Sequence, residues 1–183
     1  MTIPDFDPGP LAHVDGQLGA EGWTLVFTRD LPRPPQRVWD VLTDPDQLRA
    51  WSPYTADRHL TWVGEANLRM LDGAKSTNIP TTITRADAAR LLEYTWQLDQ
   101  LGRSVLRWEL EPFSDGTRLT LRQTVRDAEW IPKIAAGWHL CLLVAERLLQ
   151  GHPVKPIIGE TAYDFGWQAL HDAYAARLHI PRP

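Results

Sequence analysis

Residues 130–150 carry the longest amphipathic pattern in the sequence, and it constrains the fold more than any other feature. Apolar side chains recur there at the spacing of one α-helical face, where each residue turns by about 100°. They are Ile134, Trp138, Cys141, Leu142, Ala145, Leu148 and Leu149. Gly151 and Pro153 then provide a stop signal. An apolar stripe this wide needs a large partner, so we expect one long helix lying across a sheet.

The segments before this helix predict short strands joined by turns. Apolar and polar residues alternate in each of them, which indicates an antiparallel sheet with one wet and one covered face. The expected strands are residues 23–29, 59–63, 66–71, 79–85, 91–97, 103–111 and 117–125. We expect 59–63 and 66–71 to form a hairpin around Gly64, and Asp72-Gly73 to form a turn.

Helix signals stand on either side of these strands. Pro35 is placed to open a helix over residues 36–43, and Asp44 is placed to cap a second short helix. Residues 160–178 predict one further helix with an aromatic stripe. The stripe consists of Tyr163, Trp167, Leu170, Tyr174 and Leu178. Either the convex side of the sheet or a second copy of the chain must cover it, so a homodimer is an open expectation.

Composition narrows the classes of function. The chain has 183 residues, a net charge of −4 and no run of Lys or Arg, which argues against nucleic acid as a partner. No segment approaches the roughly 18 apolar residues of a membrane span, so we expect no membrane insertion and a cytoplasmic location. The single cysteine excludes an internal disulfide. The six histidines lack metal-site spacing, and we expect no metal and no cofactor.

The opening motif is Pro34-Pro35-Gln36-Arg37-Val38-Trp39-Asp40-Val41-Leu42-Thr43-Asp44-Pro45, followed by Leu48 and Trp51. With the order of elements, it resembles the helix-grip fold of the START-like, or SRPBCC, superfamily. Residues 91–96, residues 116–121 and Gly137-Trp138 are similar to the branch named for the activator of heat-shock-protein-90 ATPase homologue. The resemblance covers residues 23–150. In one departure, Gln123 stands where members of that branch often carry His.

The resemblance implies an α+β fold: a curved antiparallel sheet of about six or seven strands, wrapped around a long C-terminal helix. Two short helices follow the first strand, and one extra helix ends the chain. The expected domain spans residues 23–151. An arm of residues 1–22, with a short edge strand near residues 11–18, precedes it. A helical extension of residues 152–183 follows, packed on the domain or on a dimer mate.

Such a fold implies a cavity between the sheet and the long helix, lined by inward-facing side chains. The predicted wall consists of Trp51, Leu68, Met70, Tyr94, Trp96, Trp108, Leu119, Leu121, Gln123, Trp138, Cys141 and Leu142. Nine tryptophans suit an aromatic-lined interior, although the same side chains would also suit a filled core. Gln123 has two interpretations: it binds a polar group of a ligand, or it bonds a neighbour such as Tyr94.

Candidate catalytic residues are scarce. His139 lies on the polar arc of the long helix, and we expect a solvated side chain rather than a general base. Cys141 lies on the apolar face, where a small buried hydrophobe is the expected role. No serine lies in a nucleophile-elbow sequence and no glycine-rich phosphate loop follows a strand. We therefore assign no catalytic residue.

Three functions follow from these observations. The first is a domain that binds a small hydrophobic ligand, aromatic ones included, in the cavity. The second is a co-chaperone-like protein-interaction domain with a chaperone partner, which the branch resemblance implies. The third is an enzyme of the polyketide cyclase or aromatase kind. It would need an acid or base in the cavity, and the predicted inward faces carry almost none, so a non-enzyme is favoured.

Overall fold

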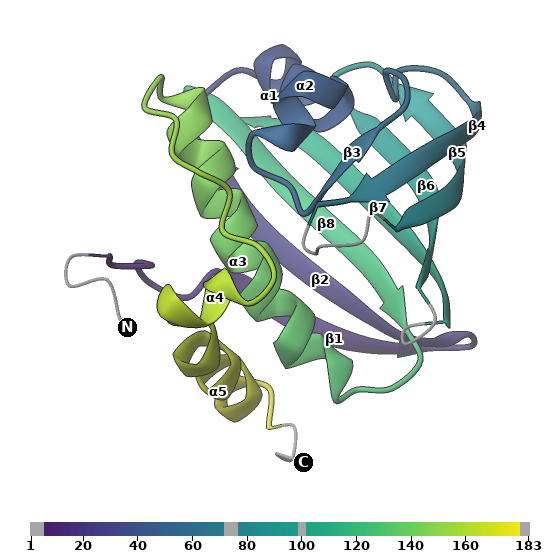
Figure 1. Ribbon diagram of the computed structural model, residues 1–183. Helices are drawn as coiled ribbons and strands as arrows, with labels where there is room; N and C mark the ends of the chain where they lie inside the picture. The colour runs from purple at the N-terminus through teal and green to yellow at the C-terminus, as the bar shows by residue number, and fades with distance from the viewer. Residues whose placement is uncertain (1–5, 72–76, 99–101, 180–183) are drawn as a thin grey trace.

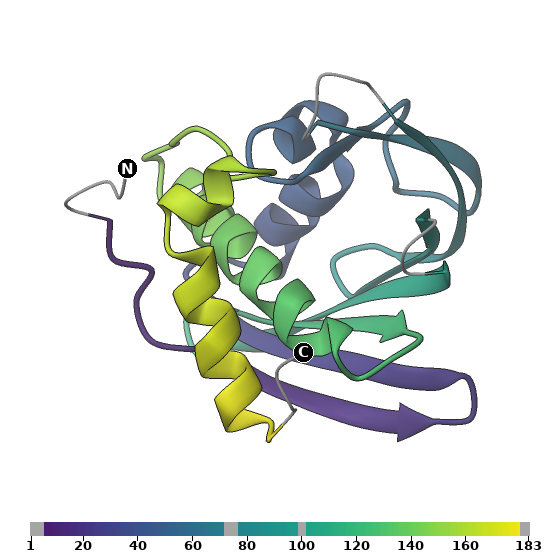
Figure 2. The same cartoon turned by 60° about the horizontal axis from the view of Figure 1, so that its bottom comes forward.

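The computed structural model describes residues 6–71, 77–98 and 102–179. A curved antiparallel sheet wraps around one long helix, which is the expected helix-grip arrangement (Figure 1 and Figure 2). The strands are β1 (His13–Gly19), β2 (Gly22–Leu31), β3 (Tyr54–Ala56), β4 (Gly64–Met70), β5 (Asn78–Asp87), β6 (Leu91–Leu98), β7 (Gly102–Phe113) and β8 (Gly116–Val125). The helices are α1 (Pro35–Thr43), α2 (Pro45–Arg49), α3 (Trp130–Leu149), α4 (Thr161–Asp164) and α5 (Trp167–Arg177).

The sheet has eight strands rather than the six or seven expected, in the order β1-β2-β8-β7-β6-β5-β4-β3. The edge strand expected near residues 11–18 is present as β1, which pairs with β2. The other edge strand, β3, was not foreseen. It spans three residues directly after Ser52-Pro53, and so short a strand carries no alternation that a sequence pattern can reveal.

The hairpin expected between residues 59–63 and 66–71 is wrong. Strand β4 pairs with β3 and with β5, and residues 59–63 form a loop without strand structure. The guanidinium group of Arg58 satisfies this loop by donating hydrogen bonds to the carbonyl oxygens of His59, Trp62, Gly64 and Glu65. Because these carbonyl oxygens are paired with Arg58, they do not require hydrogen bonds from a neighbouring strand. The turn expected at Asp72-Gly73 lies outside the described residues.

The two short helices after β2 begin where the sequence predicts, and α2 ends at Arg49, ahead of Trp51. Pro35 occupies the first turn of α1, where its missing N–H leaves nothing unpaired. Asp44 caps α2, because its carboxylate accepts hydrogen bonds from the backbone N–H groups of Asp46 (2.8 Å) and Gln47 (3.4 Å). Trp51, just after α2, donates its indole N–H to the carbonyl oxygen of Val41 (3.0 Å) and thereby ties the two helices together.

The central strands have one covered and one wet face, as the alternation predicted. Every second residue of β8 is buried, from Thr117 to Val125. On the opposite face, Arg107 pairs with Glu93 (3.0 Å) and with Glu109 (2.7 Å), and the same Glu109 also contacts Arg122 (3.2 Å). The strand register therefore directs the aromatic residues of β6 and β7 towards α3.

Helix α3 is covered on two sides rather than one. Its first side faces the sheet, and its second side faces α5, which runs beside it in both views (Figure 1 and Figure 2). The expectation of a solvated His139 is therefore wrong, because its side chain is fully buried. Although α3 is apolar nearly all round, neither it nor another helix within the described ranges is long and apolar enough to span a membrane.

The single helix expected over residues 160–178 is wrong as well. Gly166 adopts a left-handed conformation (φ 85°) and separates α4 from α5. The break also divides the aromatic stripe between α4 and α5. Leu170 and Tyr174 are buried, whereas the side chain of Tyr163 is 60% exposed. Helix α5 packs against α3 of the same chain, whereas the sequence analysis named the convex side of the sheet or a second copy as the cover.

Candidate ligand-binding site

The interior between the sheet and α3 contains a tightly packed tryptophan cluster. The rings of Trp51, Trp108 and Trp138 lie 5.1–6.4 Å apart between centroids, and two of the three pairs are edge-to-face. This geometry is favourable for aromatic packing. The cluster occupies much of the space in which the sequence analysis placed a cavity.

The polar atoms around this cluster are paired with one another. The indole N–H of Trp108 donates to the hydroxyl oxygen of Tyr94 (3.0 Å), and the Tyr94 hydroxyl also bonds that of Tyr54. Burial raises the pKa of Tyr94 to about 12, so its hydroxyl stays protonated at neutral pH. Tyr94 is therefore part of an internal hydrogen-bond network, and its hydroxyl group is occupied by Trp108 and Tyr54.

Seven residues of the predicted wall fill the core, each with a side chain that is at most 1% exposed. They are Trp51, Leu68, Tyr94, Trp108, Leu119, Leu121 and Leu142. The other predicted residues line a remaining cavity of about 300 Å³: Met70, Trp96, Gln123, Trp138 and Cys141. The structure thus divides the predicted set into residues of the packed core and residues of the cavity wall.

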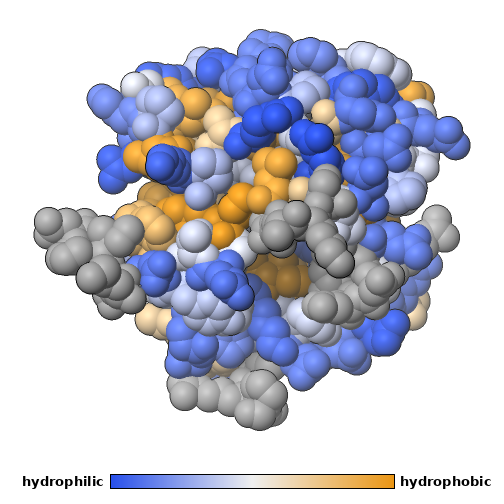
Figure 3. Space-filling model, in the orientation of Figure 1, coloured by the Kyte–Doolittle hydropathy of each residue, from blue (hydrophilic) through white to orange (hydrophobic). Residues whose placement is uncertain are grey.

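The cavity lies between the inner face of the sheet, one face of α3 and the chain that follows α3. Figure 3 shows apolar residues gathering in a recess near the middle of this face of the molecule. The sequence analysis missed the part of the wall made by Ile157, Ile158, Gly159, Ala162 and Trp167. No local pattern reveals that a Pro-containing connection folds back over the end of a sheet.

Helix α3 contributes Ile134, Gly137, Trp138 and Cys141 to the wall, at the i, i+3, i+4 and i+7 positions of one face. Gly137 is the informative member. A Cβ atom built on it meets no heavy atom within 4 Å, so the missing side chain leaves open space. A glycine within a helix was a signal that sequence reasoning had available and did not use.

Gln123 bonds a neighbour, although not the one considered. Its side-chain oxygen accepts a hydrogen bond from the indole N–H of Trp138 (2.8 Å). Trp96 differs from the other inward-facing tryptophans. Its side chain is 4% exposed, and its indole nitrogen has no hydrogen-bond partner in the described part of the chain. A buried donor left unpaired costs about 1–3 kcal/mol, so this atom stands out among the polar groups of the wall.

Cys141 has the buried, unreactive environment expected of it. Burial raises the pKa of the thiol to about 12, so it is protonated at neutral pH and is a poor nucleophile. Its sulfur lies 4.0 Å from the carbonyl oxygen of Ile157. No carboxylate, histidine, lysine or arginine belongs to the wall as the described residues form it. The cavity therefore offers apolar surface and hydrogen-bond donors rather than acid–base chemistry.

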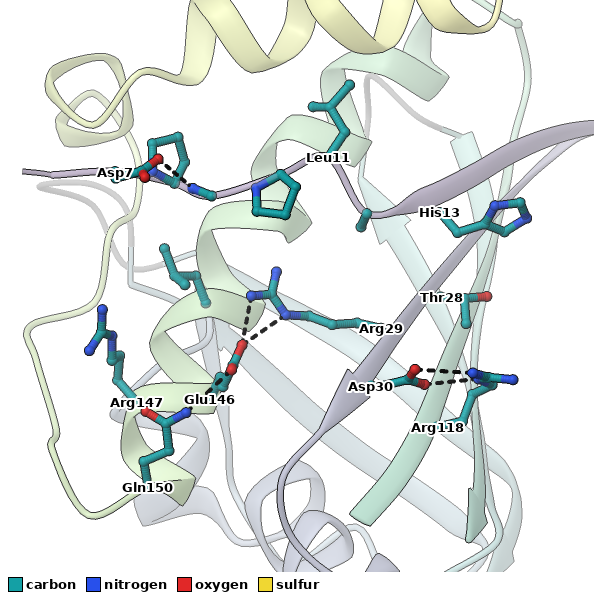
Figure 4. Close-up of a pocket in the computed structure, with 15 residues that line it drawn as sticks. Asp7, Leu11, His13, Thr28, Arg29, Asp30, Arg118, Glu146, Arg147 and Gln150 are labelled. Atoms are coloured by element: carbon teal, nitrogen blue, oxygen red, sulfur yellow. Dashed lines mark hydrogen bonds and ion pairs between the residues drawn. The ribbon is translucent and has the colours of Figure 1, made fainter. Parts of the chain in front are cut away.

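A larger hollow of about 880 Å³ lies between the N-terminal arm, β2 and α3 (Figure 4). Four of its charged groups form two ion pairs: Arg29 on β2 reaches Glu146 on α3 (2.6 Å), and Asp30 pairs with Arg118 (2.8 Å). These pairs hold β2 against α3 and β8, and the hollow lacks the mostly apolar lining that is common in small-molecule sites. We therefore place the candidate site in the smaller apolar cavity.

His139 joins three segments on the far side of α3. Its Nε2 lies 2.8 Å from the carbonyl oxygen of Pro8, which only accepts, so Nε2 carries the proton. Its Nδ1 then accepts from the hydroxyl of Tyr174 (2.7 Å), whose oxygen in turn accepts from the backbone N–H of Ala12 (3.0 Å). Burial, together with the charge of Arg29, lowers the pKa of His139. Both ring nitrogens are occupied, so the residue is structural.

No group of three or more His, Cys, Asp or Glu side chains suited to a metal ion occurs within residues 6–71, 77–98 and 102–179.

Comparisons with known proteins agree with the fold. A family model described as Activator of Hsp90 ATPase homolog 1-like protein matches residues 32–149, well over half of the chain. Among curated proteins, no sequence matches.

Solved structures share the fold. The crystal structure of CalU16 from Micromonospora echinospora matches with a TM-score of 0.67 at 19% identity, covering 92% of this chain and 97% of that chain. Its solution NMR structure matches with a TM-score of 0.70 at 19% identity, covering 92% and 94%. A protein from Arthrobacter aurescens matches with a TM-score of 0.65 at 22% identity, covering 80% and 95%. At these identities the likeness establishes architecture alone.

Proposed function

This chain belongs to the Activator of Hsp90 ATPase homolog 1-like family, and from that premise we propose that it binds a small, mostly apolar molecule in the cavity between α3 and the sheet. The observation that carries the proposal is the cavity itself, about 300 Å³ with a largely apolar wall. Small-molecule sites are commonly concave and apolar, with a few placed polar groups, and this volume lies at the lower end of their range.

Gly137 supports a cavity that is kept open. A glycine within a helix costs about 0.5–1 kcal/mol relative to alanine. Close packing does not account for it here, since a Cβ atom at this position would touch nothing within 4 Å. Gly137 therefore lowers the stability of the helix without allowing a close contact. Space for a ligand would explain its presence.

The wall argues against the enzyme alternative. A cyclase or aromatase needs a group in the cavity that gives or takes a proton near neutral pH. The ionisable residue on the described wall is Cys141, whose pKa of about 12 makes it a poor acid or base at neutral pH. The co-chaperone-like alternative would use the outer surface, so a substitution inside the cavity separates it from ligand binding.

The test compares Gly137→Leu with Gly137→Ala. Both substitutions favour the helix similarly, but leucine places a branched side chain in the open space. In native mass spectrometry, we expect a co-purifying apolar molecule, or one added from a library, on the wild type and Gly137→Ala but not on Gly137→Leu. Equal occupancy of all three proteins, or no binding and no thermal shift with any compound, would overturn the proposal.

A further inference from the structure

The unpaired indole N–H of Trp96 says more about the ligand than the apolar wall does. Trp51, Trp108 and Trp138 also face the interior, and each of their indole nitrogens has a partner. Trp96 is equally buried, lines the cavity and has none in the described chain. Because buried donors are nearly always satisfied, this one indicates a partner that the described residues do not supply.

We propose that the ligand is an uncharged aromatic molecule bearing a neutral acceptor, such as a carbonyl oxygen, which takes the hydrogen bond of Trp96 Nε1. This inference rests on the proposed function, since it assigns a chemical class to the same cavity. An indole nitrogen donates and cannot accept, so an alcohol or amide would have to present its oxygen to it.

The other polar groups of the wall point to the same class. The oxygen of Gln123 is already occupied by Trp138, which leaves its NH₂ group as a donor. The Cys141 thiol has the Ile157 carbonyl oxygen as its nearest acceptor. Among the side chains of the described wall, the polar groups that lack a partner within the described chain, Trp96 Nε1 and the Gln123 NH₂ group, are therefore donors, and they match a molecule that presents acceptors to them.

The wall also disfavours a charged ligand. It has no basic side chain among the described residues, so a buried carboxylate would lose its hydration without gaining a counter-ion. The aromatic rings that border the cavity favour a flat ligand. Trp96, Trp138 and Trp167 supply aromatic surface, and Trp96 is held in place by an edge-to-face contact with Tyr54 (4.9 Å).

Three probes of one shape test the proposal: fluorene, 9-fluorenone, which replaces the CH₂ group of fluorene by a carbonyl, and fluorene-9-carboxylate. We would titrate each into full-length wild type and into Trp96→Phe, which keeps a ring and removes the N–H. The affinity ratio of fluorenone to fluorene should fall about tenfold in Trp96→Phe, as expected for one hydrogen bond. Trp167→Phe, another ring on the wall, should keep the wild-type ratio, and the carboxylate should bind most weakly.

A second measurement reads the hydrogen bond directly on the wild type. In a ¹H–¹⁵N spectrum of the wild type, fluorenone should move one indole N–H signal downfield, whereas fluorene should not give that downfield shift. Trp96→Phe identifies the signal by removing it. If fluorene and fluorenone bind the wild type with the same ratio as Trp96→Phe, the acceptor inference is wrong and the proposed function stands. If none of the three probes binds the wild type, the inferred ligand class is wrong, whereas the proposed function is decided by the comparison of Gly137→Leu with Gly137→Ala.

Discussion

The two sides of α3 differ in how completely their polar groups are paired. On the side facing α5, His139 has a partner at each ring nitrogen, and Tyr174 both donates and accepts. On the side facing the sheet, Gly137 leaves open space, and Trp96, which lines the cavity, has an indole N–H without a partner among the described residues. The polar groups of the first side are paired within the chain, whereas the second side retains open space and an unpaired donor.

The difference indicates that one side of α3 anchors the helix and that the other side borders the cavity. The α5 side fixes the position of α3 on the sheet through long-range hydrogen bonds and the ion pair of Arg29 with Glu146. With the helix so anchored, its other face does not have to be filled with side chains. Substitutions on the two sides should therefore have different consequences for the free energy of unfolding and for binding.

The largest effect is expected at the centre of the α5 side. Tyr174→Ala removes a fully buried ring packed against Phe27 and leaves the Nδ1 of His139 without its donor. We expect a loss of about 3–5 kcal/mol in the free energy of unfolding, measured by urea denaturation. Tyr163→Ala, at a 60% exposed position, is the control and should change stability by less than about 0.5 kcal/mol. Similar losses for both would mean that α5 does not anchor α3.

The next prediction compares two tryptophans on the cavity side. Trp138→Phe deletes the donor that satisfies Gln123, whereas Trp96→Phe deletes an N–H that has no partner in the described chain. The loss of ring size is the same, so the difference isolates the hydrogen bond. We expect Trp138→Phe to be more destabilising by about 1–2 kcal/mol in the absence of ligand. Equal losses would indicate that the Trp96 N–H is satisfied by water or by other residues.

Acidification should loosen the α5 side. The pKa of folded His139 lies below its ordinary value of 6.5, chiefly through burial, so the unfolded chain binds this proton more tightly. The stability that neutral His139 contributes is therefore fully present above pH 6.5 and is lost as the pH falls through the folded pKa.

The measurement is urea denaturation of the wild type and of His139→Gln at several pH values between 7 and 5. The wild type should lose up to about 1.4 kcal/mol more per pH unit than the variant. Taking the difference cancels the carboxylates, which both proteins share. Parallel pH profiles would show that His139 is not the group that titrates.

Local patterns were sufficient for most of the fold. The proline that opens α1, the cap at Asp44 and the alternation of β6, β7 and β8 each act within a few residues, and the structure agrees with all of them. The helix break at Gly166 was missed because the aromatic spacing continues across it. The burial of His139 was missed because Pro8 and Tyr174, its partners, lie 131 and 35 residues away.

The candidate site was predicted less completely, for a physical reason. Alternation identifies which side chains point inwards, but it does not distinguish a packed core from a cavity. Trp108 and Trp96 both point inwards on neighbouring strands, yet Trp108 bonds Tyr94 within the core and Trp96 borders the open space. The difference arises from the volume that α3 and the chain after it leave unfilled, which no single segment encodes.

The smallest expected effect concerns Gly137, where a stability measurement reports directly on that open space. Gly137→Ala should raise the free energy of unfolding by about 0.5–1 kcal/mol, because alanine favours the helix and its Cβ meets no atom within 4 Å. Gly116→Ala is the matched contrast. A Cβ there would lie 2.1 Å from the carbonyl oxygen of Leu31, so the same substitution should destabilise the chain. If Gly137→Ala also destabilises, the wall closes over this position, and the cavity on which ligand binding depends is absent.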